Sequence, residues 1–235
     1  MNDLLLDIGN SSVVSCLWDG SSILESRKQA HHDLEKIVAY YALKYNRVFV
    51  SSVVPSLDEA VKRAFSNTFF VDYRNVPKLA VNLVAPEQVG SDRLLGALAA
   101  HHLTKKPTLV VDSGTALTFC YTTGDGCYEG GLLFPGMKIA SKSLNDYTAK
   151  IPLIEVAPKQ DIVGKTTRDA VEAGLYYGYI ALINGVISQY REKEPGLYVI
   201  GTGGGLDVLR DQLDLDDFEP DLVMKGLGLC ASFLT

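Results

Sequence analysis

The chain has 235 residues, a formal net charge of −6 and 47% hydrophobic residues. This length and composition exclude a disordered, collagen-like or coiled-coil protein, and they allow a core without disulfides or a structural metal. Lys and Arg never run longer than two in a row, so neither nucleic acid nor a membrane surface is expected as a partner. No signal peptide or apolar run of about 20 residues is recognised, which predicts a cytoplasmic protein.

The first part of the chain mixes strand and helix signals. In chain order they predict a strand, a turn and a second strand over 4–18, a hairpin at Asp19-Gly20, a helix over 34–43, a strand at 47–50, a helix from Ser56 to Phe65 and a helix over 91–103. Ser56 is expected to cap the second of these helices, and Ser91 or Asp92 the third.

The second part repeats the opening pattern. Residues 108–121 again predict a strand, a turn and a strand, and aligning Asp7 with Asp112 also aligns Gly9 with Gly114. Such an internal repeat predicts a duplicated fold, with half-domains 1–105 and 106–235. The remaining signals predict a long helix over 169–191, a strand at 197–200, a Gly-rich turn at 201–205 and a helix from Leu206.

The two turns of the repeat have the pattern DxGxx, which places a carboxylate, a glycine and small polar side chains at one tip. A glycine lets a phosphate approach the backbone, and a carboxylate can hold a cation. One such turn alone is an ordinary hairpin. Two turns at equivalent places of a repeat predict a clamp on one polyphosphate. The Gly-rich turn at 201–205 is either a plain tight turn or a nucleoside site.

The segment Gly90-Ser91-Asp92-Arg93 opens the helix predicted at 91–103 and has two interpretations. In the first, a side chain caps the helix and Arg93 lies on the surface. In the second, Asp92 accepts a hydroxyl proton during phosphoryl transfer, and Arg93 holds an anionic group in bidentate fashion.

A series of motifs runs in order along almost the whole chain. They are DIGNSS (7–12), SSVVP (51–55), GSDR (90–93), DSGTALTF (112–119), EGGLLFPG (129–136), VGKTT (163–167), GLYYGY (174–179), GTGG (201–204) and KGLGL (225–229). With these motifs the chain resembles the type III pantothenate kinases. The resemblance implies an α/β protein with a duplicated actin-like (ribonuclease H-like) fold, in which each half-domain has a mixed sheet flanked by helices.

The resemblance also implies an enzyme that transfers the γ-phosphoryl group of ATP to pantothenate, the first step of coenzyme A biosynthesis. Asp92 would be the catalytic proton acceptor, Asp7 would lie near the Mg²⁺ that accompanies ATP, and Asp112 would lie at a site for K⁺ or NH₄⁺. The implied ATP-binding residues are Asp7, Ile8, Gly9, Asn10, Ser11, Ser12, Val13, Val14, Thr115, Gly203 and Gly204. The implied pantothenate-binding residues are Leu83, Gly90, Ser91, Asp92, Arg93 and Thr167.

Three positions depart from the family pattern. Leu83 stands where the family usually has a tyrosine, Thr166 where it has an asparagine, and Ser113 where it has a phenylalanine. Two alternatives therefore stay open. One is a kinase of the same fold that acts on another small hydroxylated acceptor, and the other is a non-catalytic regulator that binds nucleotide.

The long predicted helix carries small residues at spacings of three or four, namely Gly174, Gly178, Ala181 and Gly185. Glycine destabilises a helix interior by about 1 kcal/mol relative to alanine, and close packing against another element would offset that cost. The partner is either another part of this chain or a second copy of it. The family resemblance favours a homodimer.

Overall fold

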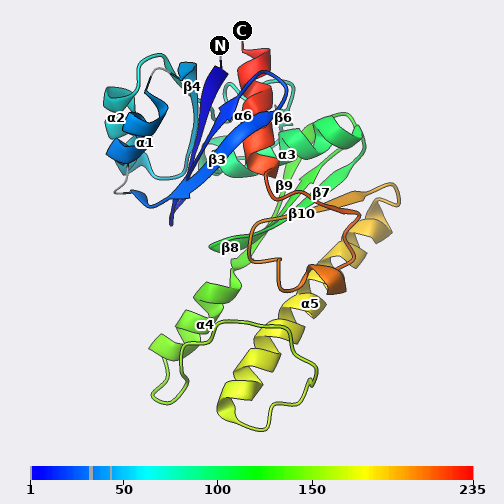
Figure 1. Cartoon of the computed structure of the whole chain (residues 1–235). Coiled ribbons are helices and arrows are strands. Elements are labelled where there is room, and N and C mark those ends of the chain that lie inside the picture. The colour runs from blue at the N-terminus through cyan, green and yellow to red at the C-terminus, as the bar shows by residue number, and fades with distance from the viewer. Residues whose placement is uncertain (1, 32–33, 43, 235) are drawn as a thin grey trace. The chain divides into compact units, whose positions relative to one another are not determined.

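The computed structural model describes residues 2–31, 34–42 and 44–234, which form two compact units (Figure 1). The first unit contains Met1–Lys105, Thr122–Glu129 and Asp221–Thr235, and the second contains Lys106–Tyr121 and Gly130–Pro220. The chain first passes between units at residue 105, where the predicted half-domains 1–105 and 106–235 also meet. The segments 122–129 and 221–235 of the predicted second half, however, belong to the first unit.

The first unit is built on a sheet with the strand order β3-β2-β1-β4-β5. Its strands are β1 (Asn2–Ile8), β2 (Val13–Trp18), β3 (Ile23–Gln29), β4 (Tyr45–Ser52) and β5 (Thr68–Phe70). β1, β2 and β3 pair antiparallel, β4 is parallel to β1, and β5 is parallel to β4. The strands predicted over 4–18 and at 47–50 and the hairpin predicted at Asp19-Gly20 are confirmed.

The helices of this unit cover both faces of the sheet. They are α1 (Leu34–Tyr41), α2 (Pro55–Ala64), the 3₁₀ helix η2 (Pro86–Gln88), α3 (Ser91–Thr104) and α6 (Leu222–Phe233). Leu4 and Leu6 of β1 form a core cluster with Ile37 of α1 and Val61 of α2, while α6 packs against β1 and β4. Figure 1 shows α1 and α2 on one side of the sheet and α6 on the other. Because both faces are covered, the three consecutive leucines of β1, Leu4, Leu5 and Leu6, are all buried.

The structure corrects the predicted helix ends. α2 begins at Pro55 and α3 at Ser91, and neither has a side-chain cap. The expected capping residues Ser56, Ser91 and Asp92 therefore all lie within a first helical turn. Proline suits the start of α2 because the N–H that it lacks would have no helical partner there. The helix predicted over 34–43 ends at residue 41, and residue 43 lies outside the described residues.

Glycines explain why α6 belongs to the first unit. A Cβ atom at Gly226 would lie 2.1 Å from the carbonyl oxygen of Leu95, so α6 and α3 touch through their backbones. A Cβ atom at Gly228 would lie 2.7 Å from the ring of Trp18, whose Nε1 donates to the Ser232 hydroxyl at 3.2 Å. These close contacts hold the end of the described chain on α3 and β2.

The second sheet repeats the first. Its strand order is β11-β10-β7-β8-β9-β6, and its strands are β7 (Thr108–Ser113), β8 (Ala116–Thr122), β9 (Cys127–Pro135), β10 (Tyr198–Thr202), β11 (Asp217–Phe218) and β6 (Ala80–Val81). β10 runs parallel to β7, as β4 does to β1. The order β9-β8-β7-β10-β11 therefore matches β3-β2-β1-β4-β5, which confirms the predicted duplication. The edge strand β6 pairs with the first residues of β9.

The second unit contains α4 (Met137–Asp146), α5 (Thr167–Lys193) and the 3₁₀ helix η3 (Arg210–Gln212). The long predicted helix is confirmed, and Thr166 caps it by accepting the Asp169 N–H at 3.1 Å. The helix predicted from Leu206 is wrong. Turns occupy that segment instead, because the Leu206 and Leu209 N–H groups bond three residues back, and the two leucines are buried in the core.

Within the described residues, α5 is the one helix that is long and apolar enough to cross a membrane by length and composition alone. Its apolar residues have a local partner, because Ile183 and Ile187 are buried in the core of the second unit with Leu109 and Val199. Core helices of globular proteins pass the same test of length and hydropathy.

Candidate active site

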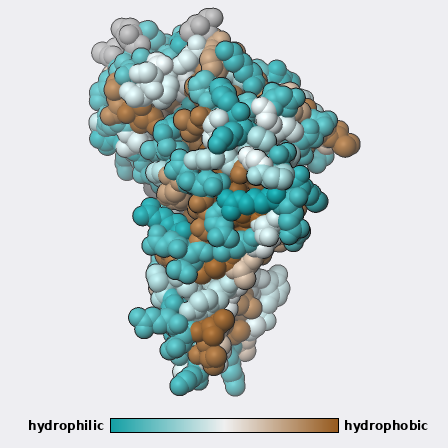
Figure 2. Space-filling view, turned by 90° about the vertical axis from the view of Figure 1, so that its right-hand side faces the viewer, coloured by the Kyte–Doolittle hydropathy of each residue, from teal (hydrophilic) through white to brown (hydrophobic). Residues whose placement is uncertain are grey.

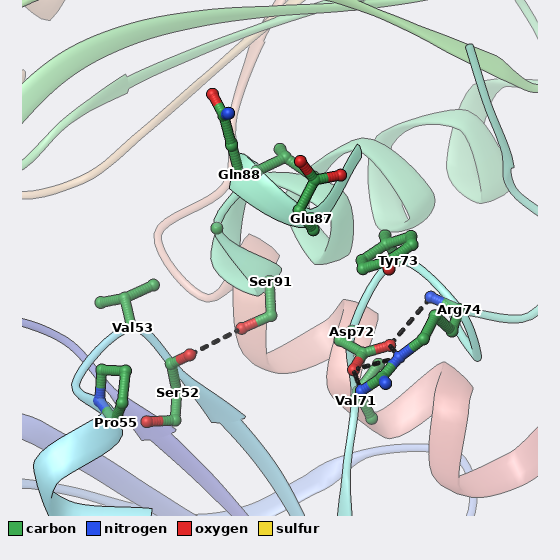
Figure 3. A pocket seen from close by; sticks show the side chains of 12 residues that line it. Ser52, Val53, Pro55, Val71, Asp72, Tyr73, Arg74, Glu87, Gln88 and Ser91 are labelled. Carbon is green, nitrogen blue, oxygen red and sulfur yellow. Dashed lines mark hydrogen bonds and ion pairs between the residues drawn. The ribbon is translucent and has the colours of Figure 1, made fainter. Parts of the chain in front are cut away.

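A cavity of about 540 Å³ lies in the first unit, at the ends of β4 and β5 and the start of α3 (Figure 3). It is lined by residues within 52–55, 71–74 and 87–91. Its volume falls within the roughly 300–1,000 Å³ of small-molecule sites. Its lining includes apolar side chains, such as Val53 and Val71, and the ion pair between Arg74 and Asp72. The cavity therefore has the size and the mixed lining of a site for a small polar molecule.

The carboxylate of Asp92 lies directly beside this cavity. A Cβ atom at Gly90 would lie 2.4 Å from Asp92 Oδ1 and 3.2 Å from Val53 Cγ1, and both Gly90 and Val53 line the cavity. A side chain at position 90 would therefore displace the carboxylate. Burial raises the pKa of Asp92, while the Arg93 N–H, which donates to Oδ1 at 2.8 Å, and the Arg93 charge oppose the rise. A desolvated carboxylate beside a cavity is suited to accept a proton.

The first DxGxx turn follows β1 in the same unit. The Gly9 N–H donates to the Ser12 carbonyl at 3.0 Å, which closes the turn, and Asn10 and Ser11 are exposed at its tip. His31 Nε2 lies 2.6 Å from the Gly9 carbonyl oxygen and therefore donates to it. The exposed side chains and the half-buried Asp7 can contact a ligand, while the hydrogen bond from His31 to the Gly9 carbonyl stabilises the turn.

The motifs of the sequence did not point to His31, because only the register of the sheet indicates that this residue lies beside the turn. Gln29, the last residue of β3, pairs with Val13, the first residue of β2. The chain therefore leaves β3 beside the turn, and His31, two residues later, reaches Gly9.

The second DxGxx turn lies in the second unit and is enclosed by glycines. Thr202 of β10 pairs with Asp112 of β7, so the Gly-rich turn lies next to it. A Cβ atom at Gly203 would lie 2.3 Å from Asp112 Oδ1, and one at Gly205 would lie 2.4 Å from Ser113 Oγ. A Cβ atom at Gly136, which sequence reasoning did not single out except within a motif, would lie 2.4 Å from the carbonyl oxygen of Gly114.

The structure therefore gathers the predicted residues into two groups. In the first unit, the register pairs Asp7 with Ser51, whose hydroxyl bonds Ser91 at the start of α3. In the second unit, Asp112, Thr115, Gly203 and Gly204 share two neighbouring turns.

A family model described as type III pantothenate kinase matches residues 3–189. The chain belongs to this family. It is 31% identical over 245 residues to the type III pantothenate kinase of Geobacillus kaustophilus, with 96% of this chain and 95% of that protein covered. It is 30% identical over 251 residues to that of Listeria monocytogenes serovar 1/2a, again with 96% and 95% covered.

Solved structures support the fold. The chain is similar to a conserved putative Baf family transcriptional activator from Campylobacter jejuni, with a TM-score of 0.69, 20% identity and 98% of both chains covered. It is also similar to a putative 2-dehydro-3-deoxygalactonokinase from Sinorhizobium meliloti, with a TM-score of 0.65, 15% identity and 98% and 96% covered. At these identities the likeness shows the actin-like fold that sugar kinases share.

Of the residues that the pantothenate kinase pattern implies for the acceptor, two line the cavity of the first unit, namely Gly90 and Ser91. The other four, Leu83, Asp92, Arg93 and Thr167, are not part of its lining. Leu83 is half-buried, and its neighbour Asn82 donates to Glu129 Oε2 at 2.8 Å. Thr167 is exposed at the start of α5 in the second unit, beside a cavity of about 210 Å³ lined by residues that include Lys165 and Asp169.

Within the described residues of this member of the pantothenate kinase family, we find no group of three or more Asp, Glu, His or Cys side chains that could hold a metal ion. Mg²⁺ is usually bound by one or two carboxylates together with substrate phosphates. Asp7, half-buried at the edge of an exposed turn, fits that mode of binding.

Proposed function

We propose that this chain phosphorylates pantothenate with ATP, the first step of coenzyme A biosynthesis. Its membership of the type III pantothenate kinase family supports the reaction. The carboxylate of the half-buried Asp92, which lies beside the cavity, carries the assignment of the site. The primary hydroxyl of pantothenate gives its proton to Asp92 as its oxygen bonds the γ-phosphorus of ATP. The bond from that phosphorus to ADP then breaks, and ADP leaves.

The donor side of this proposal uses the two DxGxx turns. Residues 7–14 bind ATP phosphates through the backbone and the exposed Asn10 and Ser11, and Thr115, Gly203 and Gly204 also contact ATP. Asp7 binds Mg²⁺, which supplies positive charge to the phosphates. Gly203 has a positive φ of +84°, and its neighbour Gly204 is exposed, so the backbone of this turn can contact a ligand.

Asp112 is proposed to hold a monovalent cation, K⁺ or NH₄⁺. Neither DxGxx turn contains a lysine, in contrast to a P-loop. Two like charges at about 4 Å repel by roughly 4 kcal/mol at an effective dielectric constant of 20. A carboxylate near phosphates therefore needs a neutralising ion, and a monovalent cation at Asp112 supplies it.

On the acceptor side, Gly90, Asp92, Arg93 and the backbone of Ser91 are proposed to bind pantothenate, together with Thr167 and the position of Leu83. Arg93 is half-buried in the first turn of α3 and can bind the pantothenate carboxylate in bidentate fashion. Leu83, which lacks the ring and hydroxyl of the usual tyrosine, would contact the acceptor only through apolar atoms.

We also propose that the protein is a cytoplasmic homodimer that binds neither nucleic acid nor membranes. Gly174, Gly178, Ala181 and Gly185 are exposed, and a Cβ placed at any of the three glycines would meet no atom within 4 Å apart from the neighbouring backbone of α5 itself. Nothing within the described chain thus packs on this face of α5. Brown, hydrophobic side chains also reach the surface in the lower part of Figure 2. Light scattering should give twice the chain mass of 25.5 kDa, and a monomeric mass with full activity would refute the dimer.

The reaction is tested by incubating the protein with ATP, Mg²⁺, K⁺ and pantothenate and detecting phosphopantothenate by mass spectrometry. Asp92→Asn keeps the size of the side chain but removes its basic oxygen, so kcat should fall about 10²–10⁴-fold. Asp19→Asn, in an exposed turn of the same unit, is the matched control and should keep wild-type turnover. A folded Asp92→Asn protein within threefold of wild type would show that another group accepts the proton.

The pH profile gives a second test. The carboxylate form of Asp92 is the active one, so kcat rises with pH through the pKa of this group. Because burial raises that pKa, the decline on the acid side should begin at a higher pH than the ordinary value of about 3.9 for aspartate would give.

A further inference from the structure

Two buried hydroxyl groups connect the strand beside Asp7 to the helix that carries Asp92. The hydroxyl oxygens of Ser51 and Ser91 lie 3.0 Å apart and are hydrogen-bonded. Ser51 is fully buried, and Ser91 is 5% exposed. Ser91 Oγ also lies 3.5 Å from the Ser52 carbonyl oxygen, and Figure 3 shows its side chain turned toward that segment. The Ser91 hydroxyl is therefore directed at β4 rather than at solvent.

Ser51 is held firmly on the sheet. It pairs with Asp7 across β1 and β4, and Ser52 pairs with Ile8. The ladder continues past the strand, because the Val53 N–H donates to the Ile8 carbonyl at 3.0 Å. Successive side chains of a strand point to opposite faces, and the Ser52 hydroxyl accordingly bonds Asp58 of α2 at 2.6 Å. Ser51 is thus a fixed point beside the Asp7 turn.

The start of α3 depends on such a fixed point. Gly90 occupies the cap position, and no side chain caps the helix. The contact between Leu95 and Gly226 holds the middle of α3 against α6. The first turn, with Ser91 and Asp92, lies beyond that contact, so a tie to the sheet is what sets its place.

We propose that Ser51 and Ser91 are positioning residues for phosphoryl transfer: their hydrogen bond fixes the Asp92 carboxylate relative to the Asp7 turn. The inference rests on the proposed roles of Asp92 and Asp7. It extends them by Ser51, to which the motif SSVVP gave no role, and by a role for the Ser91 hydroxyl that faces the protein instead of the substrate. Displacing a catalytic group by about 1 Å can slow a reaction 100-fold, so one tie at the helix start has a large effect.

The experiment compares Ser91→Ala, Ser51→Ala and the double variant, with kcat and both Michaelis constants measured in the pantothenate assay. Each single variant should lower kcat about tenfold, and both Michaelis constants should stay within about twofold, because the base is misplaced while the binding groups remain. The double variant should be no slower than either single variant, since the same bond is lost in all three. The acid-side limb of the kcat profile should also move to lower pH as water reaches Asp92.

Ser15→Ala is the matched control. Ser15 is a fully buried serine of β2 whose hydroxyl interacts with Tyr41 at 3.4 Å, and it belongs to no proposed site. It should lower the melting temperature and leave kcat and the pH profile unchanged.

Three results would overturn the proposal. If the serine variants lose stability as Ser15→Ala does but keep kcat within twofold of wild type, the bond is only structural. If the Michaelis constant for pantothenate rises while kcat is kept, Ser91 binds the acceptor directly. If the wild type forms no phosphopantothenate, the proposed function fails and the positioning role fails with it, and this outcome is visible before any variant is made.

Discussion

The two DxGxx turns begin as copies of one pattern but are stabilised in different ways. The turn after β1 is closed by its own backbone and held by the His31 side chain through the Gly9 carbonyl. The turn after β7 is also closed by its own backbone, through the Gly114 N–H that donates to the Ala116 carbonyl at 2.9 Å. It is enclosed in addition by the backbones of two other loops, at Gly136 and at Gly203, where a side chain would collide. Duplication therefore preserved the strand order, while the means of holding each turn diverged.

This difference predicts that replacing a glycine by alanine has a large effect at the second turn and a small one at the first. Gly203→Ala should destabilise the protein by about 3 kcal/mol, because φ is +84° and the new Cβ would lie 2.7 Å from the Ser113 carbonyl oxygen. Gly9→Ala should change stability by less than about 0.5 kcal/mol, because its Cβ would meet only the Ser12 carbonyl oxygen, at 3.6 Å. Urea unfolding followed by circular dichroism measures both, and equal shifts of the two midpoints would contradict the comparison.

The carboxylates of the two turns should differ in the cation that they serve. Asp112→Asn should raise the K⁺ concentration for half-maximal activation about tenfold, because it removes the charge that holds the ion. Asp7→Asn should instead raise the Mg²⁺ requirement and leave the K⁺ midpoint unchanged. Both are measured by titrating each ion with the other saturating. Full wild-type activity without K⁺ or NH₄⁺ would remove the monovalent site, and an unchanged K⁺ midpoint in Asp112→Asn would move it to another residue.

The smallest expected effect concerns His31. His31→Ala removes one hydrogen bond to Gly9, worth about 1 kcal/mol, so the Michaelis constant for ATP should rise roughly fivefold. The constant for pantothenate should not change, because Asp92 and the cavity keep their places. His102→Ala, at the far end of α3, is the control. If the two histidine variants bind ATP equally well, the Gly9 turn holds its shape without His31.

The sequence predicted the parts of the fold that local patterns encode. Strands 4–18 and 108–121, the turn between each pair and the helix at 169–191 follow from periodicity and glycine placement within a few neighbouring residues. The helix expected from Leu206 failed because Leu206 and Leu209 have a helix-like spacing but are pulled into the core of the second unit by turns. The spacing of hydrophobic residues indicates which of them are buried, but not the backbone conformation that buries them. In this segment that conformation is a series of turns.

The sequence by itself determined the duplication, the two carboxylate turns and the position of Asp92 at the start of a helix. Each can be recognised because it depends on short motifs of neighbouring residues. Only the tertiary structure decided which residues support them. His31 contacts Gly9 and Ser51 contacts Ser91, although these pairs are 22 and 40 residues apart in the chain. α6 packs on α3 across more than 100 residues of chain. Such contacts depend on strand register and backbone approach, and a pattern of neighbouring residues does not specify either of them.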